Sequence, residues 1–293
     1  MAREFADKHT MLFSFAVAMI SLGLSIAGLL LFASVFNVDV INPDIANPEI
    51  GAKLYMASVL GKILMTVFVI LIIIAVKISF IMKPSSKGLL KGILFGWILI
   101  LLGIFLFAGG FDFSKISSIK QGTWLVLLIY AVETLLAGIS EEFLCRGLLF
   151  HTIFYKNKNV KKAALISSAI FGVIHLMNVI HAPIIDTLAL VVFAFGFGIL
   201  FAAIYTRCKN LWAVVLLHGI FNFATGAANI LTPIEVIAAN GITEEITAQM
   251  PLVIVAILAA CLGMFLIRSK KMSSLPSAPM AAAALSSSLD LNM

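Results

Sequence analysis

Charged residues are scarce in this sequence, and their scarcity excludes most soluble folds. Only 12% of the 293 residues are charged while 62% are hydrophobic, whereas roughly a quarter of an ordinary soluble domain is charged. A chain this apolar cannot hide its surface from water, so we expect lipid to be its solvent. The net charge of +6 does not indicate nucleic-acid binding, because the basic residues fall in short clusters between apolar runs, as in the loops of membrane proteins.

Cysteine motifs, phosphate loops and a cleavable leader are also missing. The three cysteines, Cys145, Cys208 and Cys261, are widely spaced and form no CxxC pair, so neither a disulfide framework nor a zinc knot is indicated. No glycine-rich phosphate loop and no internal repeat stand out. The apolar run 11–36 is too long for a signal-peptide core and ends without a small-residue cleavage site. We interpret it as a retained first helix.

What the sequence does contain is a series of long apolar segments, each able to cross a membrane. About 20 apolar residues suffice for one transmembrane helix. The segments are 11–36, 54–82, 88–110, 122–155, 163–180, 187–206, 211–230 and 250–268. The sequence therefore predicts an all-α, polytopic membrane protein, a bundle of about eight transmembrane helices.

The basic residues support this number and predict an orientation. With a cytoplasmic N-terminus and eight alternating helices, fourteen lysines and arginines lie inside and three lie outside. The inside residues are Arg3, Lys8, Lys83, Lys87, Lys91, Lys156, Lys158, Lys161, Lys162, Arg207, Lys209, Arg268, Lys270 and Lys271, and the outside residues are Lys53, Lys115 and Lys120. Because cytoplasmic loops carry the excess of basic residues, we expect both termini to be cytoplasmic. The short loops favour a multi-pass protein of a prokaryotic plasma membrane.

The chain is expected to form one integral-membrane domain followed by a tail. Residues 1–272 would make up the domain, with its polar motifs in a core of about 122–225. Residues 273–293 are rich in alanine and serine and have no periodicity, which is typical of a disordered segment.

Several ionisable residues interrupt the apolar segments, and each costs at least ~2.5–3.5 kcal/mol to insert. Lys62 and Lys77 lie close enough to segment ends that we expect them to reach the membrane surface. Glu141, Glu142 and Arg146 lie deeper, in one segment. Glu142 and Arg146 are four residues apart and share a helix face, so we expect them to form a buried pair that leaves Glu141 available for chemistry.

Two further polar motifs lie on later segments. His175 follows Phe171 by four residues, and His218 precedes Asn222 by four residues. Counted inward from the nearest basic residue at ~1.5 Å per residue, Glu142, His175 and Asn222 lie at depths of ~20–21 Å and His218 at ~14 Å. Groups on three helices at nearly one level predict a shared polar chamber inside the bilayer, reached more easily from the cytoplasmic side.

The residues leave three uses of such a chamber open. Glu141 could act as a general base with His175, while His218 and Asn222 stabilise an oxyanion. Alternatively, Glu141, His175 and His218 could bind a divalent metal, although the HExxH pair of many zinc peptidases is absent. A third interpretation is that the cluster only holds the helices together.

In these motifs the chain resembles the CPBP family, the membrane peptidases related to the type II CAAX prenyl endopeptidase and to bacteriocin-processing and immunity proteins. The resemblance rests on EExxxR at Glu141, Glu142 and Arg146, on FxxxH at Phe171 and His175, and on HxxxN at His218 and Asn222. The three motifs occur in the family's order and spacing.

The resemblance implies an intramembrane endopeptidase. Glu141 and His175 would activate water, Glu142 and Arg146 would support them, and His218 and Asn222 would form the oxyanion site. A glutamic-type mechanism without cofactor or metal is expected; the alternatives are a metal-dependent version of the same peptidase and a non-catalytic immunity or scaffold protein. The expected partners are the bilayer and a membrane-associated peptide or protein, lipidated or not, with no nucleic acid.

Overall fold

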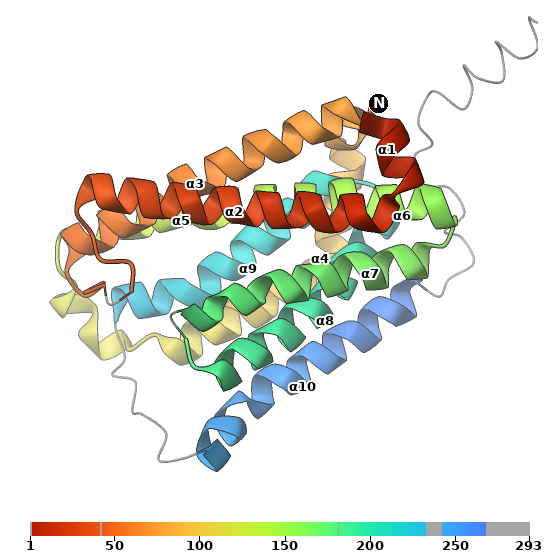
Figure 1. Ribbon diagram of the computed structural model, residues 1–293. Helices are drawn as coiled ribbons and strands as arrows, with labels where there is room; N and C mark the ends of the chain where they lie inside the picture. The colour runs from red at the N-terminus through yellow and green to blue at the C-terminus, as the bar shows by residue number, and fades with distance from the viewer. Residues whose placement is uncertain (1, 42, 181, 233–241, 268–293) are drawn as a thin grey trace, which may run out of the picture.

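The chain folds as a bundle of helices in the computed structural model, which describes residues 2–41, 43–180, 182–232 and 242–267 (Figure 1). These residues contain helices and no strand. The first half holds α1 Ala2–Lys8, α2 Thr10–Phe36, α3 Pro48–Ala75, η1 Ser79–Met82, α4 Ser86–Gly110, η2 Phe113–Ser118 and α5 Thr123–Glu142. The second half holds η3 Phe143–Leu149, α6 Phe150–Asn157, α7 Val160–Ile174, η4 His175–Ile180, α8 Ile184–Cys208, α9 Leu211–Leu231 and α10 Ile242–Ile267.

Within these residues, eight helical segments are long and apolar enough to cross a membrane, which confirms the predicted polytopic all-α fold. One of them is continuous over 35 residues, Thr123–Asn157, and comprises α5, η3 and α6. Two segments begin more than three residues earlier than predicted. The second begins at Pro48, where the Asn47 side chain caps the backbone N–H of Glu49. The last begins at Ile242 and contains Pro251.

Helix α8 forms the centre of the bundle. In its most apolar stretch 67% of the residues are buried, against 22% in α2, α4 and α10, which present apolar side chains to the surroundings. Helices α7, α4 and α10 all pack against α8 (Figure 1). The predicted disordered tail, residues 273–293, lies outside the described residues and stays a prediction.

The bundle has two ends that differ in charge. At one end the Lys156 ammonium donates to the carbonyl of Asp7, and the Trp212 indole donates to the carbonyl of Met82. At the other end the Lys120 ammonium donates to the carbonyl of Ala46. We call the first the basic end, because the clustered lysines of 83–91 and 156–162 belong to it.

Candidate active site

Glu142 and Arg146 form a sealed ion pair at a change of helix type. Arg146 Nη1 lies 2.9 Å from Glu142 Oε1, and neither side chain has any exposed surface. Between them the backbone changes from α-helix to the π-helical segment η3, a widening that is common at functional sites.

The Arg146 guanidinium is enclosed by α7 and α8. Its Nη2 donates to the carbonyl of Gly198 at 2.9 Å, and its carbon lies 4.7 Å from the centre of the Phe171 ring. A Cβ on Gly198 would lie 2.8 Å from Ser168 Cβ and 3.1 Å from Arg146 Nη2. Glycine at this position therefore makes room for the arginine, which is fixed by three helical segments.

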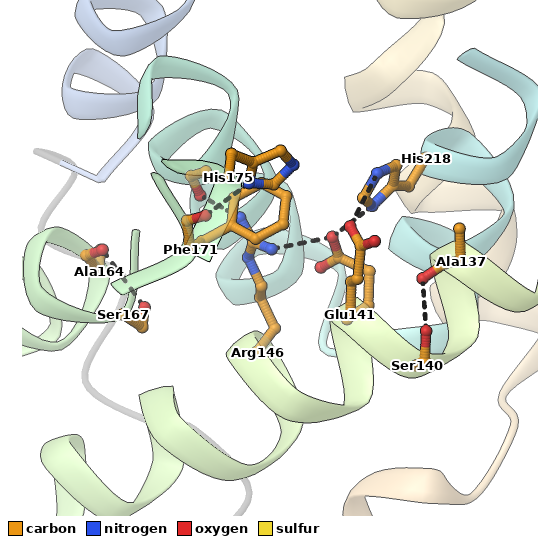
Figure 2. A network of polar contacts seen from close by, with 11 residues as sticks. Ala137, Ser140, Glu141, Arg146, Ala164, Ser167, Phe171, His175 and His218 are labelled. Atoms are coloured by element: carbon orange, nitrogen blue, oxygen red, sulfur yellow. Dashed lines mark hydrogen bonds and ion pairs between the residues drawn. The ribbon is translucent and has the colours of Figure 1, made fainter. Parts of the chain in front are cut away.

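His218 of α9 approaches both glutamates. Its Nδ1 lies 2.8 Å from Glu142 Oε1, and its Nε2 lies 3.7 Å from Glu141 Oε2. The helices come this close because a Cβ on Gly138 of α5 would lie only 2.6 Å from the carbonyl oxygen of Val215. Figure 2 shows Glu141 and His218 turned toward one another. Glu142 is thus shared by Arg146 and His218, whereas the Glu141 carboxylate has no hydrogen bond within the described part of the chain.

His175 occupies the end of α7, where the helix gives way to η4. Its Nδ1 lies 2.7 Å from the carbonyl oxygen of Phe171 and its ring packs edge-on against the Phe171 ring (Figure 2). Because a carbonyl oxygen only accepts hydrogen bonds, Nδ1 carries the proton. In the neutral ring, Nε2 is then left as an acceptor.

Glu141 and His175 face one cavity of about 410 Å³. Its polar lining residues are Ser25, Lys62, Glu141, His175 and Asn178, and its apolar ones come mainly from α2 and η4. The lining extends to Val40 and Ile41, in the loop after α2. This loop lies at the end of the bundle opposite the basic end, so the cavity extends toward that end; the predicted easier access from the cytoplasmic side stays a prediction.

Asn222 shares no hydrogen bond with this group among the described residues. Its carbonyl oxygen accepts a hydrogen bond from the Tyr130 hydroxyl, but in the residues that the structure describes its side chain makes no hydrogen bond. Neither Asn222 nor His218 lines the cavity. Five of the six residues singled out in the sequence therefore gather here, through contacts or a shared cavity, and Asn222 does not join them.

Comparison with known proteins assigns this part of the chain. Residues 122–224 match the family model described as type II CAAX prenyl endopeptidase Rce1-like. In this segment the chain is similar to that family. The chain is also 28% identical over 118 residues to the "Putative membrane peptidase YdiL" of Bacillus subtilis (strain 168), a stretch that covers 40% of this chain and 44% of that protein. No solved structure matches the chain.

These matches confirm the resemblance predicted from the motifs and support a membrane peptidase at the level of the family. The chain spans less than half the length of the curated relative. All six motif residues lie within the Rce1-like segment. Three of the eight membrane helices, α2, α3 and α4, precede that segment, and α2 and α3 contribute to the wall of the cavity.

Lys62 is a polar residue of the cavity whose position was predicted wrongly from the sequence. It was expected to reach the membrane surface, yet it lies 14 residues after Pro48 and 13 before Ala75, about 20 Å from either end of α3. Its ammonium lies 3.1 Å from Glu133 Oε1, which also accepts a hydrogen bond from Ser58 Oγ. Because Lys62 precedes the Rce1-like segment, the motifs of that segment could not have indicated this residue.

The side-chain positions bear on the alternative of a metal site. Among the described residues, no group of three or more His, Cys, Asp or Glu side chains is placed to hold a metal ion. Glu141, His175 and His218 therefore do not form such a group in this arrangement.

Proposed function

We propose that the protein is an intramembrane endopeptidase of the glutamic type, in which Glu141 activates a water molecule. The observation that carries the proposal is the contrast between two adjacent glutamates. Glu142 is committed to Arg146 and His218, whereas Glu141 faces a cavity together with His175. A carboxylate that borders a cavity and lacks a hydrogen-bond partner is free to accept a proton.

The proposed reaction is the hydrolysis of a peptide bond. Glu141 takes a proton from water while the water oxygen attacks the carbonyl carbon, and the electron pair of the C=O bond moves onto oxygen. When the carbonyl re-forms, the C–N bond breaks and Glu141 returns the proton to the departing nitrogen. His175 Nε2 would accept a hydrogen bond from the second hydrogen of the water and so orient it.

Glu142, Arg146 and His218 would act as supports. Arg146 fixes Glu142, and Glu142 fixes the ring of His218 beside the Glu141 carboxylate. This chain of contacts restricts where the Glu141 carboxylate can lie. The role of Asn222, with His218, as an oxyanion group stays a prediction.

The substrate would be a membrane-associated peptide or protein, with or without a lipid group. A cavity of about 410 Å³ belongs to the size class of small-ligand sites, so it would take a few extended residues rather than a folded domain. By the distribution of basic residues we propose a cytoplasmic location for both termini, in a prokaryotic plasma membrane. The cavity would then extend toward the outer side.

The proposal is tested by Glu141→Gln, which keeps the shape of the side chain and removes the base. We expect folded protein with no proteolysis, read by proteomics of peptide termini in membranes containing wild type or variant. Glu49→Gln, at the start of α3, is the matched control and should leave the pattern of termini unchanged. Unchanged termini in the Glu141→Gln membranes would contradict the proposal and favour the non-catalytic immunity or scaffold protein.

The metal-dependent alternative is tested separately. A glutamic mechanism predicts that the purified protein retains its turnover after dialysis against excess chelator, since no step needs a Lewis acid. Loss of turnover on chelation and its recovery with one added metal would establish the metal-dependent version instead.

A further inference from the structure

A cation that faces the cavity is not used by the mechanism above. Lys62 borders the cavity with Glu141 and His175, and its ammonium pairs with Glu133 of α5. An ionisable side chain in the middle of a membrane helix carries a large insertion cost and indicates function by default. Among the described residues that line this cavity, Lys62 is the only cation.

The ammonium of Lys62 has hydrogen-bonding capacity to spare. It carries three N–H donors, and the pair with Glu133 at 3.1 Å uses one of them. Its side chain is 19% exposed, against no exposure for Arg146. Lys62 can therefore donate to a group within the cavity without leaving Glu133.

In the proposed reaction one negative charge moves from one group to another, and the total charge of the site stays the same. At the start the negative charge is on Glu141; when Glu141 accepts the proton of water, the same charge appears on the former carbonyl oxygen. A cation placed to interact with Glu141 before the transfer can interact with the oxyanion after it. Fixed cations aimed at developing charge, in a site that excludes water, are the largest single contribution to many enzymatic rates.

We infer that Lys62 is a catalytic residue that donates a hydrogen bond to the oxyanion formed when water attacks the substrate carbonyl. This inference rests on the proposed hydrolysis and adds a residue to it. It adds Lys62 to the oxyanion role that the sequence motifs suggest for His218 and Asn222, neither of which lines the cavity. Glu133 would hold the ammonium in place, and Lys62 keeps its proton throughout.

The competing explanation is that Lys62 only neutralises Glu133. The two explanations differ in the effect of removing both charges together. Replacing a buried ion pair by neutral groups of similar volume is often harmless to stability. If Lys62 is merely a counter-ion, Lys62→Met should be damaging and the double variant Lys62→Met/Glu133→Gln should recover. If Lys62 stabilises the oxyanion, the double variant should fold and remain impaired.

The experiment compares kcat and KM for Lys62→Met, the double variant and wild type on a cleaved peptide identified from the termini analysis. We expect kcat to fall about 10²–10³-fold, as for loss of one oxyanion donor, with KM little changed because the oxyanion exists only after binding. Lys62→Arg, which keeps the charge and donors, should recover part of the rate. A double variant with wild-type kcat would overturn the inference.

A binding measurement complements the rates. In the Glu141→Gln background, which is not expected to turn over, Lys62→Met/Glu133→Gln should bind the same peptide with unchanged affinity. A fall in affinity by 10²-fold or more would show that Lys62 contacts the bound substrate rather than the oxyanion, and would also overturn the inference. The outcomes are distinguishable from failure of the proposed function, because that failure appears as unchanged termini in the Glu141→Gln membranes.

Discussion

Among the described residues, two lysine or arginine ion pairs lie in the interior of the bundle, and they are built in different ways. Glu142 and Arg146 are one helical turn apart on the same continuous span, and both are completely buried. Lys62 and Glu133 come from different helices, α3 and α5, and their side chains are 19% and 13% exposed. The first pair is sealed between α7, α8 and α9, whereas the second borders the cavity that Glu141 faces.

The comparison distinguishes a pair that supports the structure from a pair that can take part in the reaction. A sealed pair can fix neighbouring groups but cannot meet a substrate, and removing one of its members leaves an uncompensated charge in the protein interior. A pair at the edge of a cavity can exchange contacts with a bound molecule. We therefore expect substitutions in the sealed pair to act on folding and those in the cavity pair to act on turnover.

Arg146→Met is expected to have the largest effect on stability. It leaves the Glu142 carboxylate buried without its cation and removes the bond to the Gly198 carbonyl. Loss of one partner of a buried pair costs about 3–5 kcal/mol. The free energy of unfolding in detergent micelles measures this, and a loss below about 1 kcal/mol, far under that range, would contradict the description of the pair as a structural support.

Gly198→Ala probes the enclosure of the same pair and should have a smaller effect. The added Cβ would lie 2.8 Å from Ser168 Cβ and 3.1 Å from Arg146 Nη2, and overpacking of this kind costs about 1–3 kcal/mol. Gly109→Ala is the matched control, because a Cβ at Gly109 would meet nothing within 4 Å. Equal unfolding free energies for the two variants would show that the arginine has more room than the structure indicates.

The two pairs also differ in how far the sequence could predict them. The spacing of Glu142 and Arg146 predicts their contact, because residues four apart share a helix face. The contact of Lys62 with Glu133 depends on how α3 and α5 pack, and nothing local specifies that register. The apolar pattern could predict the number of spans, because the thickness of the membrane sets the length of each span. It could not predict which residues of different spans meet, because the membrane does not set those contacts.

The position of Asn222 is a second case in which sequence spacing did not predict a contact between helices. A spacing of four places His218 and Asn222 on one helix face, but it also moves Asn222 about 6 Å along the axis. The glutamates meet α9 at the level of His218, where Gly138 allows close approach. Depth counting placed Asn222 rather than His218 at the level of Glu142, an error of one helical turn, and it could not anticipate that η3 is π-helical.

Ser58→Ala tests the cavity pair without changing any charge. It removes the hydrogen bond at 2.9 Å from the Ser58 hydroxyl to Glu133 and leaves the Lys62–Glu133 pair intact. Hydrogen bonds between membrane helices contribute about 0.6 kcal/mol on average, so the unfolding free energy should fall by about that amount. If turnover instead slowed about as much as for loss of an oxyanion donor, the placement of Glu133 would matter as much as the Lys62 cation itself.

Lys53→Met should have the smallest effect on stability and turnover, and it is the most direct control for Lys62→Met. Lys53 lies on the same helix as Lys62, nine residues earlier, and it also pairs with a glutamate, Glu49, at 2.6 Å. The pair is exposed, with side chains 42% and 75% accessible. Exposed ion pairs contribute little, because water and salt already stabilise each charge.

We expect Lys53→Met to leave both the unfolding free energy and kcat unchanged in the same assays. The substitution is chemically identical to Lys62→Met, so the contrast isolates the position of the cation from the general effect of losing a lysine on α3. If Lys53→Met lowered kcat as much as Lys62→Met, the effect would belong to the charge or stability of the whole helix. In that case the cavity-facing ammonium would have no special place in the reaction.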